Sequence, residues 1–445
     1  ACLSLRAGMQ GARLNVCINT GSLHDAAFAA KLRINSDHNR VNNAAYGKTM
    51  HYAGDRFVHT FSALLPPEPW FESHPEYFAL REDGERDRGA LCLSHPEVVR
   101  LLTRGALDAL EADPAADILS VSQNDNPQYC HCPACQAVAD EEGSQAGPLI
   151  RAVNAVAAAV AQRHPHVLVD TLAYMYSRKP CRTKPADNVI VRLCSFECEF
   201  DTTLDDPQRE PNAGFAADLE GWSQLTNRLY VWDYTTDFDI YLQTFPNFHV
   251  LQPNIQYLLR HHVTGIFEQG NREPDGEFGA LRAYLLAKLL WNPEEDVQAL
   301  TDGFLEHYYG KGWRHLKAYI TGFEELIREL GTGATIYAKT EKLVPFKDRR
   351  TRAFLERARA WWDEAEAEAA GEQKERVRRS RLQFTYLSQC AACDEQKDTA
   401  SWKQENGRLR ADLIRCGIRM REHIKGTLEE VDTDISPLEW VDPTR

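Results

Sequence analysis

The chain lacks any run of apolar residues long enough to cross a membrane. Spanning a bilayer takes about 18 or more consecutive apolar residues, and the 445-residue sequence contains no such run. It also lacks an excess of positive charge, because 51 Lys and Arg stand against 65 Asp and Glu, a net charge of −14. Phosphate binding needs clustered positive charge, so this balance argues against nucleic acid or an anionic membrane as the main partner. Neutral ligands such as sugars remain open.

Cysteine is too sparse for a disulfide-built scaffold, with 12 in the whole chain. There is no internal repeat and no low-complexity tail. The first ten residues, ACLSLRAGMQ, do not have the pattern of a secretory signal peptide, so we expect a mature or trimmed chain whose compartment is undetermined. With 43% hydrophobic and 26% charged residues, the composition is that of a globular protein.

Short apolar runs separated by amphipathic stretches indicate a parallel sheet with covering helices. The predicted strands are 57–61, 90–94, 117–122, 167–174, 188–194, 228–232 and 263–268, with one more within 2–20. Helices are expected from Pro96, over 149–160 and over 215–222. Eight β/α units in roughly 275 residues match the size of a (β/α)₈ barrel. The predicted fold is α/β, a (β/α)₈ TIM barrel over residues 1–276.

The strand pattern stops after Gly276. A helical stripe runs over 278–290, helices are expected to continue through 294–330, and the segment 350–430 is charged and helical. We therefore predict a C-terminal α-helical domain over residues 277–445, packed on the barrel.

Polar and aromatic residues gather where the predicted strands end, which is where a (β/α)₈ barrel has its active site. They are His59, Asn124, Asp125, Tyr174, Glu197, Glu199, Trp232, Asp233, Tyr234 and Glu268. Carboxylates in two protonation roles, with aromatic rings beside them, are what glycoside hydrolysis needs. Two alternatives stay open, since Asp and Asn after a strand also cap helices, and His59 could be a satisfied core histidine.

The Cys-His-Cys-x-x-Cys cluster offers three thiolates, from Cys130, Cys132 and Cys135. Tetrahedral zinc usually takes four ligands, and His131, Cys194 or Cys198 could complete a structural zinc site. The alternatives are free thiols, a disulfide, or a catalytic metal.

Nine short motifs follow one another over residues 40–310. They are VHTF (58–61), HPEYF (74–78), LCL (91–93), SVSQNDN (120–126), YCHCPAC (129–135), NVIVRLC (188–194), VWDY (231–234), FEQG (267–270) and LLWNP (289–293). Together they resemble glycoside hydrolase family 163, the endo-β-N-acetylglucosaminidases that act on complex-type N-glycans. The resemblance implies a TIM-barrel hydrolase that cuts the GlcNAc-β1,4-GlcNAc core of N-glycans or glycoproteins. It favours a secreted, periplasmic or cell-surface location.

The family also implies a retaining, substrate-assisted mechanism, in which the 2-acetamido group of the sugar is the nucleophile. No cofactor is required for this chemistry. At the matching positions, Asn124 is the candidate for orienting the acetamide and Asp125 for proton transfer; alternatively Glu197 or Glu199 is the acid and Asp125 polarises the acetamide. Tyr174 is a candidate donor to the acetamide oxygen, and the expected sugar-binding residues are His59, Glu199, Trp232, Asp233, Tyr234 and Glu268.

Competing interpretations are a zinc-dependent or α-glucuronidase-like hydrolase and a non-catalytic glycan-binding barrel. A chelator should abolish activity under the zinc-dependent interpretation, and glycan binding without turnover would favour the binding barrel.

Overall fold

The computed structural model describes residues 50–270 and 277–418. Within them lies a five-stranded parallel sheet whose strands follow one another in chain order. The strands are β3 (Ile118–Ser120), β4 (Leu168–Ala173), β5 (Val189–Cys194), β6 (Leu229–Tyr234) and β7 (Val263–Gln269). Each strand falls where the sequence predicts one, and all residues of β3 to β6 except Leu168 and Trp232 are buried, as expected for a sheet covered on both faces.

Helices connect these parallel strands, as a parallel sheet requires. They are α5 (Pro133–Glu142) and α6 (Ala146–Arg163) after β3, α7 (Glu210–Leu225) after β5, and α8 (Leu251–Arg260) after β6. Helix α4 (Pro96–Ala112) precedes β3, and the His95 side chain caps it by accepting from the Glu97 N–H. The helices expected from Pro96, over 149–160 and over 215–222 are therefore confirmed.

One predicted strand is wrong, and another belongs to a different sheet. Residues 57–60 form no strand, because His59 adopts a left-handed φ of 57° and the short helix α3 (Phe61–Leu64) begins directly after them. Residues 90–94 overlap the end of β2 (Arg86–Leu91), which pairs antiparallel with β1 (Phe78–Leu80) in a separate two-stranded sheet. The strand predicted within 2–20 lies outside the described residues.

The parallel α/β sheet is confirmed, whereas closure into eight strands stays a prediction. One further parallel bridge, from Tyr52 to Ile118, extends the sheet beyond β3. Over residues 50–270 and 277–418 the sheet thus has five strands and this bridge.

The two faces of the sheet pack against different partners. Side chains alternate along a strand, so Val191 and Val231 point to one face, where they join the main core with Leu102 of α4. We call this the helix face. Ile190 and Tyr230 point to the other, the inner face, where they cluster with Tyr52, Ile118 and Phe57.

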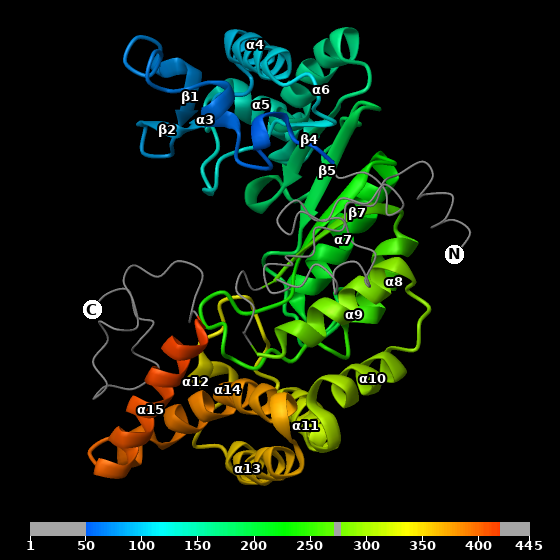
Figure 1. Cartoon of the computed structure of the whole chain (residues 1–445). Helices are drawn as coiled ribbons and strands as arrows, with labels where there is room; N and C mark the ends of the chain where they lie inside the picture. The colour runs from blue at the N-terminus through cyan, green and yellow to red at the C-terminus, as the bar shows by residue number, and fades with distance from the viewer. Residues whose placement is uncertain (1–49, 271–276, 419–445) are drawn as a thin grey trace.

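A second helical region follows β7, and Figure 1 places it at the opposite end of the molecule from the β1–β2 hairpin. It comprises α9 (Gly279–Trp291), α10 (Val297–Tyr309), α11 (Trp313–Leu330), α12 (Thr340–Leu343), α13 (Arg349–Glu368), α14 (Gly371–Gln396) and α15 (Ala400–Cys416). Short 3₁₀ turns occur at Ala53–Asp55, Pro75–Tyr77, Met175–Ser177 and Gly310–Gly312. The predicted helices are confirmed up to residue 418; the domain boundary after 276 stays a prediction.

The segment between α11 and α12 lies against the strand-end loops of the sheet. The Phe200 N–H donates to the Ala334 carbonyl, and the Phe238 N–H donates to the Ile336 carbonyl, both at 2.8 Å. These bonds bring Tyr337 within 6.0 Å of Phe196 between ring centroids. None of the described helices is both long and apolar enough to span a bilayer.

Candidate active site

Asp125 lies just beyond the end of β3, with 66% of its side chain exposed. The Tyr174 hydroxyl, at the end of β4, donates to Asp125 Oδ1 at 3.2 Å. His59 Nε2 lies 4.0 Å from the same oxygen. An open carboxylate that accepts one hydrogen bond and has an imidazole nitrogen 4.0 Å away is an arrangement that can transfer protons to a bound ligand.

Contacts with the segment that follows β3 fix the position of His59. Its N–H donates to Ser122 Oγ at 2.9 Å, and its Nδ1 lies 2.8 Å from the Gln123 carbonyl oxygen. A carbonyl oxygen can only accept, so Nδ1 carries the hydrogen and Nε2 is presented to Asp125.

Tyr174 is held by a tight turn that follows β4. Ser177 Oγ accepts from the Tyr174 N–H at 3.2 Å and from Gln123 Nε2 at 2.8 Å. Burial, and then the negative charge of Asp125, raise the pKa of Tyr174, so its phenol stays protonated and donates. Met175 next to it has a left-handed φ of 49°, as His59 has one of 57°. Strained residues of this kind gather at functional sites.

Aromatic rings extend this group along the inner face. Phe196 packs edge-on to Tyr174 at 5.4 Å, and Tyr234 stacks on Trp232 at 6.2 Å. Trp232 also contacts Phe57, 5.4 Å away between centroids. We call His59, Asp125, Tyr174, Phe196 and Trp232 the strand-end site. Tyr337, 47% exposed, lies beside it next to Phe196.

Glu197 and Glu199 are both engaged in ion pairs. Arg178 Nη1 lies 3.0 Å from Glu197 Oε2, while the same guanidinium donates to Asp218 at 2.7 Å through Nε. Arg209 Nη1 lies 3.1 Å from Glu199 Oε2. Burial raises the pKa of Glu199 although Arg209 opposes it. Arginine fixes the position of each carboxylate, while at Glu199 the effect of burial outweighs that of the Arg209 charge.

Asp233 and Glu268 form a pair on the helix face. They are register partners on β6 and β7, and alternation places Asp233 on the side of Val231, opposite Trp232. They are 5% and 3% exposed. Ser195 Oγ donates to Asp233 at 2.5 Å, whereas Glu268 Oε2 has no hydrogen-bond partner among the described residues. The structure does not bring this pair together with Asp125.

Burial shifts the protonation of this pair strongly. It raises the pKa of Asp233 to about 6, although the Ser195 hydrogen bond opposes the shift. Burial and the neighbouring Asp233 charge raise the pKa of Glu268 well above its ordinary value. Two carboxyl groups kept apart from solvent in this way are uncharged over part of the acidic range.

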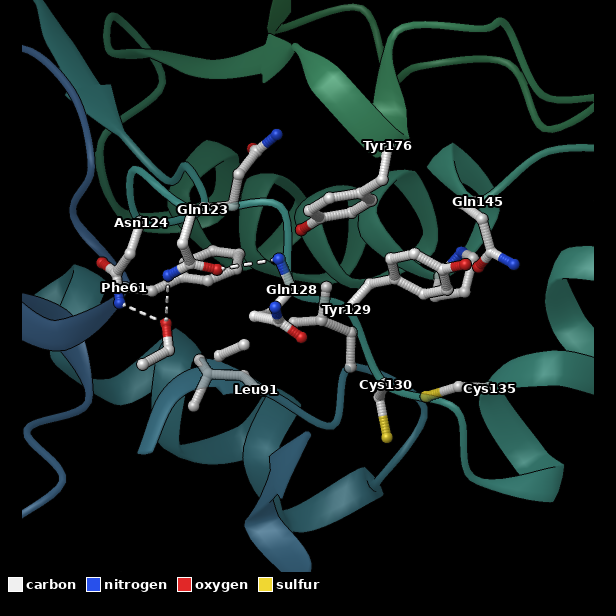
Figure 2. Close-up of a pocket in the computed structure, with 15 residues that line it drawn as sticks. Phe61, Leu91, Gln123, Asn124, Gln128, Tyr129, Cys130, Cys135, Gln145 and Tyr176 are labelled. Carbon is white, nitrogen blue, oxygen red and sulfur yellow. Dashed lines mark hydrogen bonds between the residues drawn. The ribbon is translucent and has the colours of Figure 1, made fainter. Parts of the chain in front are cut away.

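Asn124 points away from Asp125, toward the β1–β2 hairpin. Its Nδ2 donates to the Gly89 carbonyl at 2.7 Å and to Ser62 Oγ at 2.8 Å. Figure 2 shows Asn124 on the wall of a pocket that Gln123, Gln128, Gln145, Tyr129 and Tyr176 also line. Asp125, His59 and Tyr174 do not line this pocket. It therefore lies on the other side of the 123–126 segment.

Four thiols come together beside that pocket. The Sγ atoms of Cys92, Cys130, Cys132 and Cys135 all lie within 4.8 Å of one another. The sequence suggests His131, Cys194 or Cys198 as the fourth member, and the structure corrects this to Cys92. His131 instead stacks on Tyr129 and has its Nδ1 3.9 Å from Glu82.

The two remaining candidates for the fourth position lie in other cores. Cys194 belongs to the cluster of Leu172 and Tyr174 on the inner face, and Cys198 belongs to the main core. Cys92 directly follows the β1–β2 hairpin, and the sequence predicts that this stretch is a barrel strand. Because Cys92 is 40 residues from Cys132 in the sequence, the spacing does not indicate that the two thiols meet.

The ion pair that is buried within the sheet is not among the predictions from the sequence. Arg192 of β5 pairs with Asp170 of β4, with Nε 3.2 Å from Oδ2, and neither is more than 3% exposed. The Arg192 guanidinium lies over the Phe57 ring, 4.4 Å from its centroid, and also contacts the Tyr52 hydroxyl. The signal was a single charge inside each apolar run, VLVDTLAY and VIVRLC, since buried charges are almost always paired.

A family model described as a domain of unknown function, DUF4838, matches residues 19–321. The chain belongs to the DUF4838 family. No curated protein matches the sequence.

Two solved structures are similar to the chain over much of its length. A mutant of the O-GlcNAc hydrolase of Thermobaculum terrenum is 13% identical, over 79% of this chain and 76% of that one, with a TM-score of 0.40. A GH138 enzyme targeting pectin rhamnogalacturonan II is 8% identical, over 77% and 66%, with a TM-score of 0.33. TM-scores this low do not establish a shared fold or activity.

Proposed function

We propose that this DUF4838 protein is a carbohydrate-active hydrolase, and more finely an endo-β-N-acetylglucosaminidase that cuts the GlcNAc-β1,4-GlcNAc core of complex-type N-glycans. The observation that carries the proposal is the strand-end site itself. Asp125, an open carboxylate beyond a parallel strand, accepts from Tyr174 and faces His59. The motif resemblance to glycoside hydrolase family 163 supplies the finer assignment, and closure of the sheet into an eight-stranded barrel belongs to the same proposal.

In the proposed reaction Asp125 transfers the protons. As an acid it protonates the leaving glycosidic oxygen while the acetamide oxygen of the substrate attacks C1 and forms an oxazolinium ion. As a base it then takes a proton from the water that opens this ring, which restores the configuration at C1. Before the substrate binds, the Tyr174 hydroxyl orients Asp125 through its hydrogen bond, and His59 Nε2 lies 4.0 Å from the same oxygen.

The acetamide is assigned to Tyr174 rather than Asn124. The phenol of Tyr174 stays protonated, and in this proposal its single O–H turns from Asp125 to the acetamide oxygen when the substrate binds. The Asn124 amide instead donates to Gly89 and Ser62, away from Asp125. In this proposal the hydrogen bonds of Asn124 fix the position of the backbone next to Asp125. Glu197 is held by its ion pair with Arg178.

Aromatic side chains supply the sugar-binding surface. Trp232 is partly exposed and stacks with Tyr234, and Tyr337 stands exposed next to Phe196. Flat apolar rings with a polar edge suit the faces of pyranose rings. Asp233 and Glu268 have no part in this surface, because they lie on the helix face.

The test is incubation of the purified chain with a glycoprotein that carries complex-type N-glycans, followed by mass spectrometry of the protein. The proposal expects one GlcNAc to remain on each processed asparagine, and inhibition by an acetamido-derived thiazoline that mimics the oxazolinium ion. Glycan binding without any product would instead indicate a binding protein. Turnover indifferent to the thiazoline would exclude substrate assistance.

A further inference from the structure

We propose that the chain holds one structural zinc ion between Cys92, Cys130, Cys132 and Cys135. Four thiolates in a closed tetrahedron are a common ligand set of structural zinc. The four residues come from two separate segments, the end of the β1–β2 hairpin and the loop and first turn of α5. The proposal does not rest on the proposed hydrolase activity.

The distances between the sulfur atoms fit a zinc tetrahedron. With zinc–sulfur bonds of about 2.3 Å, the corners of a regular tetrahedron lie about 3.8 Å apart. Cys92 Sγ lies 3.6 Å from that of Cys132 and 3.8 Å from that of Cys135. A disulfide requires a sulfur–sulfur distance of about 2.05 Å, and all four cysteines are free thiols.

Backbone N–H groups already point at two of the sulfurs. The Leu80 N–H donates to Cys130 Sγ at 3.3 Å, and the Cys135 N–H donates to Cys132 Sγ at 3.4 Å. Such bonds stabilise an anionic sulfur, because a thiolate can only accept. Cys132 also caps α5, whose N-terminal dipole favours negative charge at the same place.

Burial and the ligand set favour a structural rather than a catalytic metal. Cys92, Cys130 and Cys135 are 5%, 6% and 2% exposed, and four protein ligands leave no open position for water or substrate. Soft thiolates exclude magnesium and calcium, and select zinc or iron. Zinc is the choice for a single closed site that needs no redox partner.

The ion would fasten the hairpin to the segment that bears Asp125. Gly89, in β2, accepts from the side chains of Asn124 and Asn126, on both sides of Asp125. Cys92 and Cys130 flank this contact along the chain. A metal that bridges Cys92 and Cys130 would hold the hairpin in place without a large apolar core. The hydrophobic cluster that contains these cysteines is indeed small and separate from the main core.

Metal analysis of the purified full-length chain tests the proposal. The expected result is one zinc per chain, retained through desalting and released stoichiometrically to a zinc indicator when the thiols are blocked with a mercurial. Cobalt incorporated in its place should give the absorption of a tetrahedral four-thiolate site. No metal, stoichiometric iron, or a disulfide between any two of the four cysteines would overturn it.

Two matched variants test the ligand set: one removes a proposed ligand, and the other removes a cysteine outside the cluster. Cys92→Ser should lose the zinc, whereas Cys181→Ser should keep it, because Cys181 is equally buried at 5% but lies outside the cluster. Full zinc in Cys92→Ser would contradict the proposal. If that variant does not fold, zinc release from the wild-type chain still decides, because it requires no substitution and no activity.

Discussion

The two faces of the parallel sheet both carry carboxylates, yet only one face presents them to solvent. On the inner face, Asp125 is 66% exposed and accepts from Tyr174. On the helix face, Asp233 and Glu268 are almost fully buried as register partners. All three follow or end strands of the same sheet. The comparison teaches that a strand-end position in the sequence does not by itself bring a side chain to the site, because alternation sends every second residue under the helices.

The faces also differ in how they satisfy their buried polar groups. The inner face neutralises Asp170 with Arg192. The helix face leaves two carboxyl groups together, of which Asp233 accepts from the Ser195 hydroxyl and the Tyr234 backbone. One face therefore holds a compensated charge, and the other holds groups that are most stable when protonated.

Removing the exposed carboxylate should have the largest effect on activity. Asp125→Ala should lower the rate of glycan release at least about a hundredfold, in line with the usual contribution of general acid–base catalysis. Thermal stability should not change, because the side chain is largely exposed. Asp108→Ala is the control, since Asp108 is 65% exposed on α4 and should release glycan at the wild-type rate. Wild-type turnover by Asp125→Ala would remove Asp125 from the chemistry.

Breaking the inner-face ion pair should have the largest effect on stability. Asp170→Ala leaves the Arg192 guanidinium buried without its partner, which should lower the free energy of unfolding by about 3–5 kcal/mol. Urea denaturation measures it. Glu97→Ala, which breaks an exposed pair with Arg100, should change stability far less. Equal losses in the two variants would show that the inner-face pair is not effectively buried.

The helix-face pair should make stability fall as pH rises. The pKa of Asp233 is about 6 when folded against an ordinary 3.8, so the folded state holds the extra proton. The stabilisation is fully present below about pH 4 and is lost as pH rises through about 6. Two pKa units correspond to about 3 kcal/mol.

Asp233→Asn isolates this effect, because asparagine cannot ionise. Relative to the wild type, its free energy of unfolding should increase between about pH 4 and pH 6. Unfolding curves of both proteins across this range measure the difference. A difference independent of pH, or one that shrinks as pH rises, would contradict the assignment.

The smallest effect concerns a lone hydroxyl on the helix face. Thr171 is fully buried, and its Oγ1 has no hydrogen-bond partner among the described residues. Thr171→Val keeps the shape and removes the unpaired group, so it should stabilise the protein by about 1 kcal/mol. Thr60→Val should destabilise it, because the Thr60 hydroxyl donates to the Ser120 carbonyl at 2.8 Å. Melting temperatures decide, and a destabilised Thr171→Val would show that an unseen partner exists.

The parallel strands could be predicted from the sequence, because runs such as VIVRL are apolar on both faces and alternate with helices. The stretches 57–61 and 90–94 share that composition but not that structure. The first turns at His59 through a left-handed backbone conformation, and the second pairs antiparallel with β1. An apolar composition indicates that a segment is buried, but it does not indicate which other segment the residues pack or pair with.

The site was only partly predictable for the same reason. Asp125, Tyr174 and His59 were expected near one another and are joined in the structure. Asn124 is adjacent to Asp125 in the sequence, but its side chain points in the opposite direction and donates to the Gly89 carbonyl. Cys92 escaped notice because only the fold of the hairpin brings it to Cys132.

The most direct test of the account compares Asp125→Asn and Asp233→Asn on one complex-type N-glycoprotein, with the initial rate of glycan release as the measurement. Each change removes one carboxylate near a strand end of the same sheet and keeps its shape. The account predicts that Asp125→Asn loses at least about a hundredfold in rate, while Asp233→Asn releases glycan at the wild-type rate. Equal losses in both variants, or a loss in Asp233→Asn alone, would contradict it.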